Sequence, residues 1–139
     1  MDVRQQIDGY ISGLPAAKRS EMQDLHQRIM EIAPDVRLWF LDGRNENGKV
    51  VSNPNIGYGS ETLTYADGGS RAFYRLGLSA NTSGLSIYVM GLKDKTYLAG
   101  TYGSRIGKAK VTGYCIRFNS VRDVDSGVLS EIFADALGG

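Results

Sequence analysis

Residues 74–91, YRLGLSANTSGLSIYVMG, decide how the rest of the sequence is interpreted. Apolar side chains recur at every second position on both sides of a polar centre: Tyr74, Leu76, Leu78 and Ala80 before it, and Leu85, Ile87 and Val89 after it. This alternation is typical of β-strands that bury one face. Because residues 81–84, NTSG, are turn formers, the stretch predicts an antiparallel β-hairpin, with Tyr74 on the same face as Leu76.

The segment before the hairpin begins with helical periodicity. Apolar residues recur three or four positions apart: Val3, Ile7, Tyr10, Ile11 and Leu14 in a first run, and Met22, Leu25, Ile29 and Ile32 in a second. Gly13 and Pro15 separate the two runs, and Pro34 marks the end of the second. We therefore expect two helices in the first third of the chain.

Further strands and helices surround the predicted hairpin. Residues 36–41, 55–58 and 62–65 read as strands, separated by turn segments at 42–49 and 66–70. A short helix capped by Asp94 is expected over residues 95–102, a last strand over residues 113–118, and a closing helix from Asp123 or Asp125. The sequence predicts a single α+β domain over residues 1–139. It has two layers, an antiparallel β-sheet with helices packed on one face, in the order α-α-β(several)-α-β-α.

Composition narrows the class of protein. The formal net charge is +1, so a generic electrostatic grip on nucleic acid is not expected. No apolar run is long enough to cross a bilayer, and the first residues do not resemble a secretory signal. Cys115 and His26 are the only residues of their types, so no internal disulfide and no Cys/His zinc site can form. We expect a cytoplasmic protein that does not bind a membrane.

A glycine-lysine turn, GSRIGKAKVTG at residues 103–113, is the first candidate site. It is not a Walker phosphate loop, because only three residues separate Gly103 from Gly107 and Ala109 replaces the metal-binding hydroxyl. Arg105, Lys108 and Lys110 nevertheless offer positive charge beside the backbone amides of a turn. The two interpretations are an anion site and a turn with solvated lysines.

A second candidate ligand-binding segment is Gly57, Tyr58 and Gly59, where glycines allow either close backbone approach to a ligand or a bend in a strand. His26 is a candidate general base or metal ligand, and the alternative is a histidine at the edge of the apolar stripe. Cys115 is a candidate nucleophile, although a buried packing role is the commoner fate of a free cysteine.

Carboxylates on the second predicted helix give a metal alternative. Glu21, Asp24 and Glu31, together with His26, could supply ligands to a hard or borderline cation. Helical spacing also brings Asp24 close to Arg28, which favours a face of mixed ion pairs instead.

The chain resembles the YdhG-like domain family, a group of small bacterial domains mostly of unknown function. The resemblance rests on three segments: IDGYISGLPAAKRSEMQDLHQRIMEIAPDV at 7–36, NIGYG at 55–59 and RIGKAKVTGYCIRFNSVRDVDSGVLSEIF at 105–133, together with the central hairpin. It implies a bacterial source, a two-layer α+β fold and a glycine-lysine turn in a group not known as nucleotide hydrolases. Some relatives are described as frataxin-like iron chaperones, and no catalytic residues of the family map onto this sequence.

Three functional hypotheses follow. The first is a non-catalytic cytoplasmic domain, without a cofactor, that binds a small anion or a protein partner through the GYG segment and the basic turn. The second is an iron or metal carrier of the frataxin-like type, and the third is an enzyme that uses Cys115 or His26. A homodimer through a sheet edge or through the tyrosine-rich surface is compatible with each of them.

Overall fold

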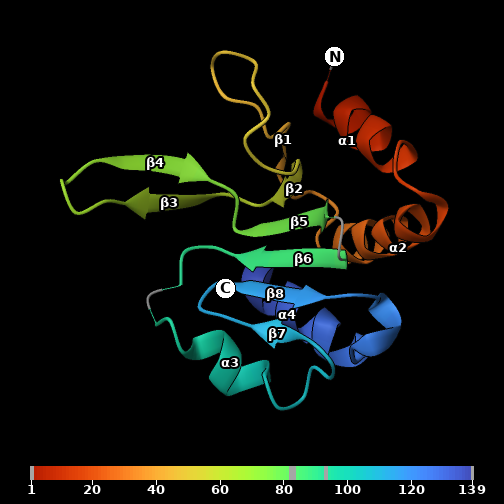
Figure 1. Ribbon diagram of the computed structural model, residues 1–139. Coiled ribbons are helices and arrows are strands. Elements are labelled where there is room, and N and C mark those ends of the chain that lie inside the picture. The colour runs from red at the N-terminus through yellow and green to blue at the C-terminus, as the bar shows by residue number, and fades with distance from the viewer. Residues whose placement is uncertain (1, 82–83, 93, 139) are drawn as a thin grey trace.

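The chain begins with two helices, and a long run of strands follows them (Figure 1). The computed structural model describes residues 2–81, 84–92 and 94–138. Helices α1 (Val3–Ser12) and α2 (Ala16–Ile32) come first. The strands β1 (Leu38–Leu41), β2 (Asn55–Tyr58), β3 (Glu61–Thr64), β4 (Ser70–Phe73), β5 (Leu76–Asn81) and β6 (Gly84–Val89) follow. The remaining elements are α3 (Tyr97–Tyr102), β7 (Lys110–Val111), β8 (Cys115–Phe118), a 3-10 turn η1 (Val121–Asp123) and α4 (Ser126–Gly138).

The predicted hairpin is confirmed at the centre of the fold. Strands β5 and β6 pair antiparallel, with Leu78 opposite Ile87, and both side chains are fully buried. They lie inside a six-stranded antiparallel sheet of order β1-β2-β5-β6-β8-β7. Two positions of the predicted turn, 82 and 83, lie outside the described residues.

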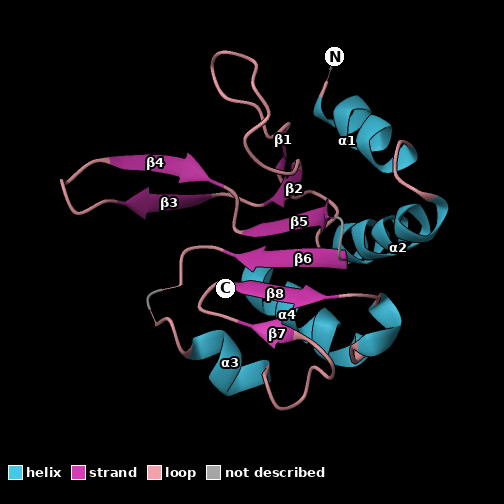
Figure 2. Cartoon of the chain, viewed as in Figure 1, coloured by secondary structure: helices cyan, strands magenta, loops and turns pink. Residues whose placement is uncertain are grey.

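One face of this sheet forms the hydrophobic core with the helices. Alternate strand residues point toward α1, α2 and α4, as the period of two requires. The cluster that they form includes Ile7, Ile11, Met22, Leu25 and Ile29 from the first two helices, Ile56, Leu76, Leu78, Ile87 and Ile116 from the sheet, and Leu129, Ile132 and Phe133 from α4. Figure 2 shows α4 behind β8 and β7, with the strands in front. The predicted α+β architecture and the order of its elements are confirmed.

The opposite face carries a packed aromatic group, and here the prediction for Tyr74 was wrong. Its ring does not share a face with Leu76 but lies over Gly57 and Gly77, which are cross-strand partners on the other side of the sheet. The chain bends at residue 75, between the end of β4 and the start of β5, and this breaks the alternation. Phe73 stacks on Tyr74 with ring centroids 4.1 Å apart, and Trp39 meets the edge of Phe73 at 6.2 Å.

This aromatic group joins the main sheet to the base of a small second sheet. Strands β3 and β4 pair only with each other and project away from the rest of the molecule (Figure 1). Phe73 is the last residue of β4, so its contacts with Trp39 and Tyr74 connect the projecting hairpin to the main sheet.

Several boundaries differ from the sequence prediction. Strand β7 arises inside the glycine-lysine turn, where no strand was expected. The predicted strand over 113–118 begins only at Cys115, which leaves Tyr114 56% exposed, and the short helix begins at Tyr97 rather than next to Asp94. Within the described residues, no helix has the length and apolar character needed to span a membrane.

Candidate functional site

A recess of about 430 Å³ lies where the glycine-lysine turn meets the sheet. We call it the basic recess, because Lys108, Lys110 and Arg117 are the charged side chains among the described residues that line it. The rest of its wall comes from the β5–β6 connection, the end of β8 and the turn itself: Asn81, Gly84, Leu85, Gly107, Ala109, Phe118 and Asn119.

The turn that carries the lysines is fixed to the segment before α4. Ile106 is fully buried, and its carbonyl accepts a hydrogen bond of 2.7 Å from the Asp125 amide. The Lys108 amide donates to the Asp123 carbonyl at 2.9 Å. Gly107, with φ of +101°, lies so close to this segment that a Cβ would be 2.7 Å from the Asp123 oxygen. A side chain at position 107 would therefore be strained, and glycine allows the turn to approach.

Lys110 and Arg117 are cross-strand partners in β7 and β8. Partners in an antiparallel pair point to the same face, with Cβ atoms about 5 Å apart. Both side chains are exposed, and neither forms an ion pair within the described part of the chain. Like charges directly opposite each other destabilise a sheet, so this pair carries an unfavourable repulsion that the attraction of a bound anion would offset.

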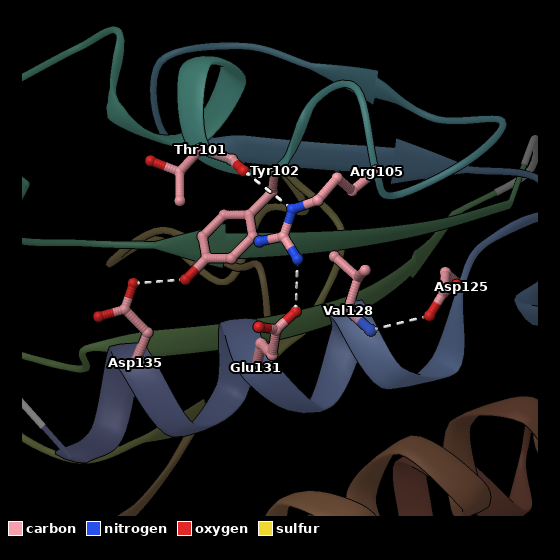
Figure 3. Close-up of polar contacts among 7 residues, drawn as sticks. All are labelled: Thr101, Tyr102, Arg105, Asp125, Val128, Glu131 and Asp135. Carbon is pink, nitrogen blue, oxygen red and sulfur yellow. Dashed lines mark hydrogen bonds and ion pairs between the residues drawn. The ribbon is translucent and has the colours of Figure 1, made fainter.

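Arg105, the third cation predicted for the turn, is directed elsewhere. Figure 3 shows its guanidinium above α4, where it pairs with Glu131 at 2.9 Å. It also lies over the ring of Tyr102, 5.5 Å from the centroid. The structure thus brings Lys108 and Lys110 together with Arg117, and it does not bring Arg105 into the lining of the recess.

Sequence reasoning missed Arg117 because its contribution depends on β7. Residue 117 alternates with the core residues Ile116 and Phe118, which predicts only that its side chain points away from the core. Its partner could be identified only if residues 110–111 were recognised as a strand, and two residues carry no periodicity.

Gly57 and Tyr58 of the GYG segment lie on β2, and Gly59 follows it; in the sheet, β5, β6 and β8 separate β2 from β7. Tyr58 is fully buried, and its hydroxyl is 2.6 Å from His26 Nδ1. Gly57 lies beneath the Tyr74 ring. Gly59 adopts φ of +79°, and its carbonyl accepts a hydrogen bond from Trp39 Nε1 at 2.7 Å. The two candidate ligand-binding segments are therefore not parts of one site.

The half-buried His26 of α2 and the buried Tyr58 of β2 form a polar pair. Burial lowers the pKa of His26 and raises that of Tyr58. Both effects favour the uncharged forms, because desolvation penalises charge. In that state one hydrogen bond satisfies the only polar atom of the buried Tyr58 side chain.

The carboxylates proposed as metal ligands each have another partner. Glu21 accepts hydrogen bonds from Ser120 Oγ at 2.7 Å and from the Val121 amide at 2.6 Å. Asp24 pairs with Arg28 at 3.1 Å, and Glu31 accepts from Gln27 at 3.0 Å. Within the described residues, no three His, Cys, Asp or Glu side chains converge in a group that could hold a metal ion.

Cys115 is 5% exposed and lies on β8 opposite Tyr88. Its side chain is on the same face of the sheet as that of Arg117, two residues along the strand. A buried free thiol of this kind packs as a small apolar side chain.

A comparison of the chain with models of protein families, with curated proteins and with solved structures finds no match.

Proposed function

We propose that the chain is a non-catalytic binding domain that holds a small anion in the basic recess. The anion would contact the ammonium groups of Lys108 and Lys110 and the guanidinium of Arg117. A guanidinium presents two parallel N–H donors to a phosphate or carboxylate, whereas each lysine contributes a compact charge.

The observation that carries this proposal is the like-charged couple Lys110 and Arg117, which has no ion-pair partner among the described residues and has Lys108 beside it. Surface cations of globular proteins are usually interspersed with carboxylates. Here no carboxylate is present among the described residues that line the recess. Positive charge is concentrated at one hollow of a chain whose net charge is only +1.

The dimensions of the recess indicate the size of the anion. Its volume of about 430 Å³ lies at the lower end of the range of small-molecule sites. A phosphorylated or carboxylate-bearing metabolite matches that volume better than a polymer does.

We assign no catalytic role to His26 or Cys115 because of where they lie. His26 Nδ1 is hydrogen-bonded to the Tyr58 hydroxyl, and Cys115 is buried. Neither residue is among those that line the recess. We further propose that the domain belongs to the YdhG-like family and works in the cytoplasm. The family assignment rests on the sequence segments at 7–36, 55–59 and 105–133, and the proposed location on the single cysteine, which leaves no internal disulfide to form.

A thermal-unfolding screen with inorganic phosphate, sulfate, sugar phosphates and small dicarboxylates tests the proposal. A ligand at about a hundred times its dissociation constant adds roughly 2.7 kcal/mol to the free energy of unfolding, which raises the midpoint measurably. Lys110→Gln should reduce this rise, because it removes a charge from the recess.

Arg105→Gln is the matched control, since it removes a cation from the same turn whose guanidinium is paired with Glu131. Its response to the anion should equal that of the wild type. Equal losses in the two variants would show that the recess is not the site. No rise with any anion would overturn the small-anion proposal and would favour a protein partner.

A further inference from the structure

A second pocket, of about 360 Å³, lies at the opposite end of β6 from the basic recess. We call it the α3–α4 pocket. Its floor is apolar and comes from β6, α3 and α4: Val89, Leu98, Ile132 and Ala136, all buried. A concave, mostly apolar surface with a few convergent polar groups is the usual form of a small-molecule site.

Asp135 is the polar group with the most defined position in this pocket. Its Oδ2 accepts hydrogen bonds from the hydroxyls of Tyr97, at 2.5 Å, and Tyr102, at 2.6 Å. No protein hydrogen bond to Oδ1 is found among the described residues, and Figure 3 shows this second oxygen directed away from Tyr102. The two phenols therefore fix the carboxylate in one orientation and leave one oxygen for a ligand, which reduces the entropic cost of binding.

The charge of the pocket favours a cationic ligand. Asp135, Asp94 and Glu61 contribute carboxylates to the lining, and Arg75 contributes one guanidinium, which pairs with Glu61 at 3.4 Å. Asp135 and Ala136 also lie in the last turn of α4, where the carbonyl groups give the helix end a partial negative charge. A cation would be stabilised there by the field of the helix and by the excess of carboxylates.

We propose that the α3–α4 pocket binds a small organic ammonium, a primary or secondary amine with a hydrocarbon or aromatic body. The N–H groups of the ammonium bind Asp135 Oδ1, and the apolar body packs on the half-buried side chains of Met90 and Leu92, above the buried floor. This site is separate from the basic recess, so it does not depend on the anion proposal.

The test uses three molecules of similar shape: phenethylamine, 2-phenylethanol and 3-phenylpropionate, which carry an ammonium, a hydroxyl and a carboxylate. Binding to the full chain is followed by amide chemical shifts in a nitrogen-15 correlation spectrum at millimolar ligand. We expect phenethylamine to bind best, with the shifted amides concentrated at residues 89–92 and 132–136. The propionate should not bind in the pocket.

Asp135→Asn retains an acceptor for both phenols but removes the charge, and it should weaken phenethylamine binding at least about tenfold. Asp35→Asn is the matched control, because Asp35 is exposed and lies after α2, outside the pocket lining. The spectrum of each variant also reports whether it is folded.

Equal binding of the amine and the alcohol would overturn the proposal, as would unchanged affinity in Asp135→Asn. Amine-induced shifts located outside residues 89–92 and 132–136, or no binding of the amine, would overturn it as well.

Discussion

Replacing Gly77 by alanine tests whether the glycines at the centre of the sheet serve packing. A Cβ built on Gly77 would lie 2.5 Å from Tyr74 Cε1, 2.7 Å from Cζ and 2.9 Å from Oη. Carbon atoms in contact are normally about 3.5–4.0 Å apart, so the ring would have to move by about 1 Å. The Tyr74 side chain is 4% exposed and stacks on Phe73, which leaves little room for that movement.

The expected loss of stability combines two opposing effects. Overpacking of this kind costs about 1–3 kcal/mol. Alanine in a strand is about 0.5–1 kcal/mol more favourable than glycine, because less backbone entropy is lost on folding. Gly77→Ala should therefore lower the free energy of unfolding by about 0.5–2 kcal/mol, measured by urea denaturation.

The Tyr74→Ala background separates this explanation from a general requirement for glycine. The ring atoms near Gly77 are then absent, so Gly77→Ala should become stabilising by about 0.5–1 kcal/mol. Gly57→Ala should not be rescued in this way, because its Cβ would lie 2.7 Å from Tyr74 Cβ, which alanine retains. Equal destabilisation by Gly77→Ala in both backgrounds would refute the packing argument.

Three further predictions concern charged and polar pairs. Lys110→Gln should raise the unfolding free energy of the unliganded protein by a few tenths of a kcal/mol at low salt, since it relieves repulsion from Arg117, and a loss of stability would contradict this. The pKa of His26 is lowered from 6.5 in the folded state. As pH falls below 6.5, the unfolded state therefore binds more protons than the folded state does. Stability should therefore decrease as pH falls through 6.5 toward the lowered pKa, and His26→Gln should weaken this dependence in urea titrations at several pH values. Glu21→Ala should cost about 1–3 kcal/mol in the same assay, because it leaves a backbone amide and a hydroxyl without their acceptor, whereas an unchanged midpoint would contradict the geometry.

Periodicity predicted the parts of the fold whose side chains pack regularly. The alternation of Leu76, Leu78 and Ala80 specified a strand and its core-facing side chains, although Gly77 and Ser79 on the other face are buried too, and the spacing of Met22, Leu25 and Ile29 specified a helix. These patterns are local, so they can be read along the chain. They also predicted the layer arrangement, because a strand with one apolar face must bury it against other elements.

Contacts between distant residues could not be predicted in the same way. The position of the Tyr74 ring depends on two glycines in neighbouring strands, and only the pairing of Gly57 with Gly77 makes the space for it. Similarly, Arg105 was predicted to belong to the basic turn, but Glu131, on α4, draws its guanidinium away.

The candidate site was predicted in part. The sequence indicated Lys108 and Lys110 through their place in a glycine-rich turn, and the structure places both in one recess. Arg117 was missed because its side chain meets Lys110 only through the short strand β7. The α3–α4 pocket was not predicted, since its polar group combines Tyr97 and Tyr102 with Asp135, more than thirty residues further along the chain.

The most direct test of the anion proposal is a titration of the full chain with inorganic phosphate, followed by amide chemical shifts. We predict saturable shifts at residues 84–85, 107–110 and 117–119, which border the basic recess. Added sodium chloride should weaken them, because salt screens the charges involved. Shifts concentrated at residues 57–59, or no saturable shifts at low salt, would contradict the proposal that Lys108, Lys110 and Arg117 form an anion site.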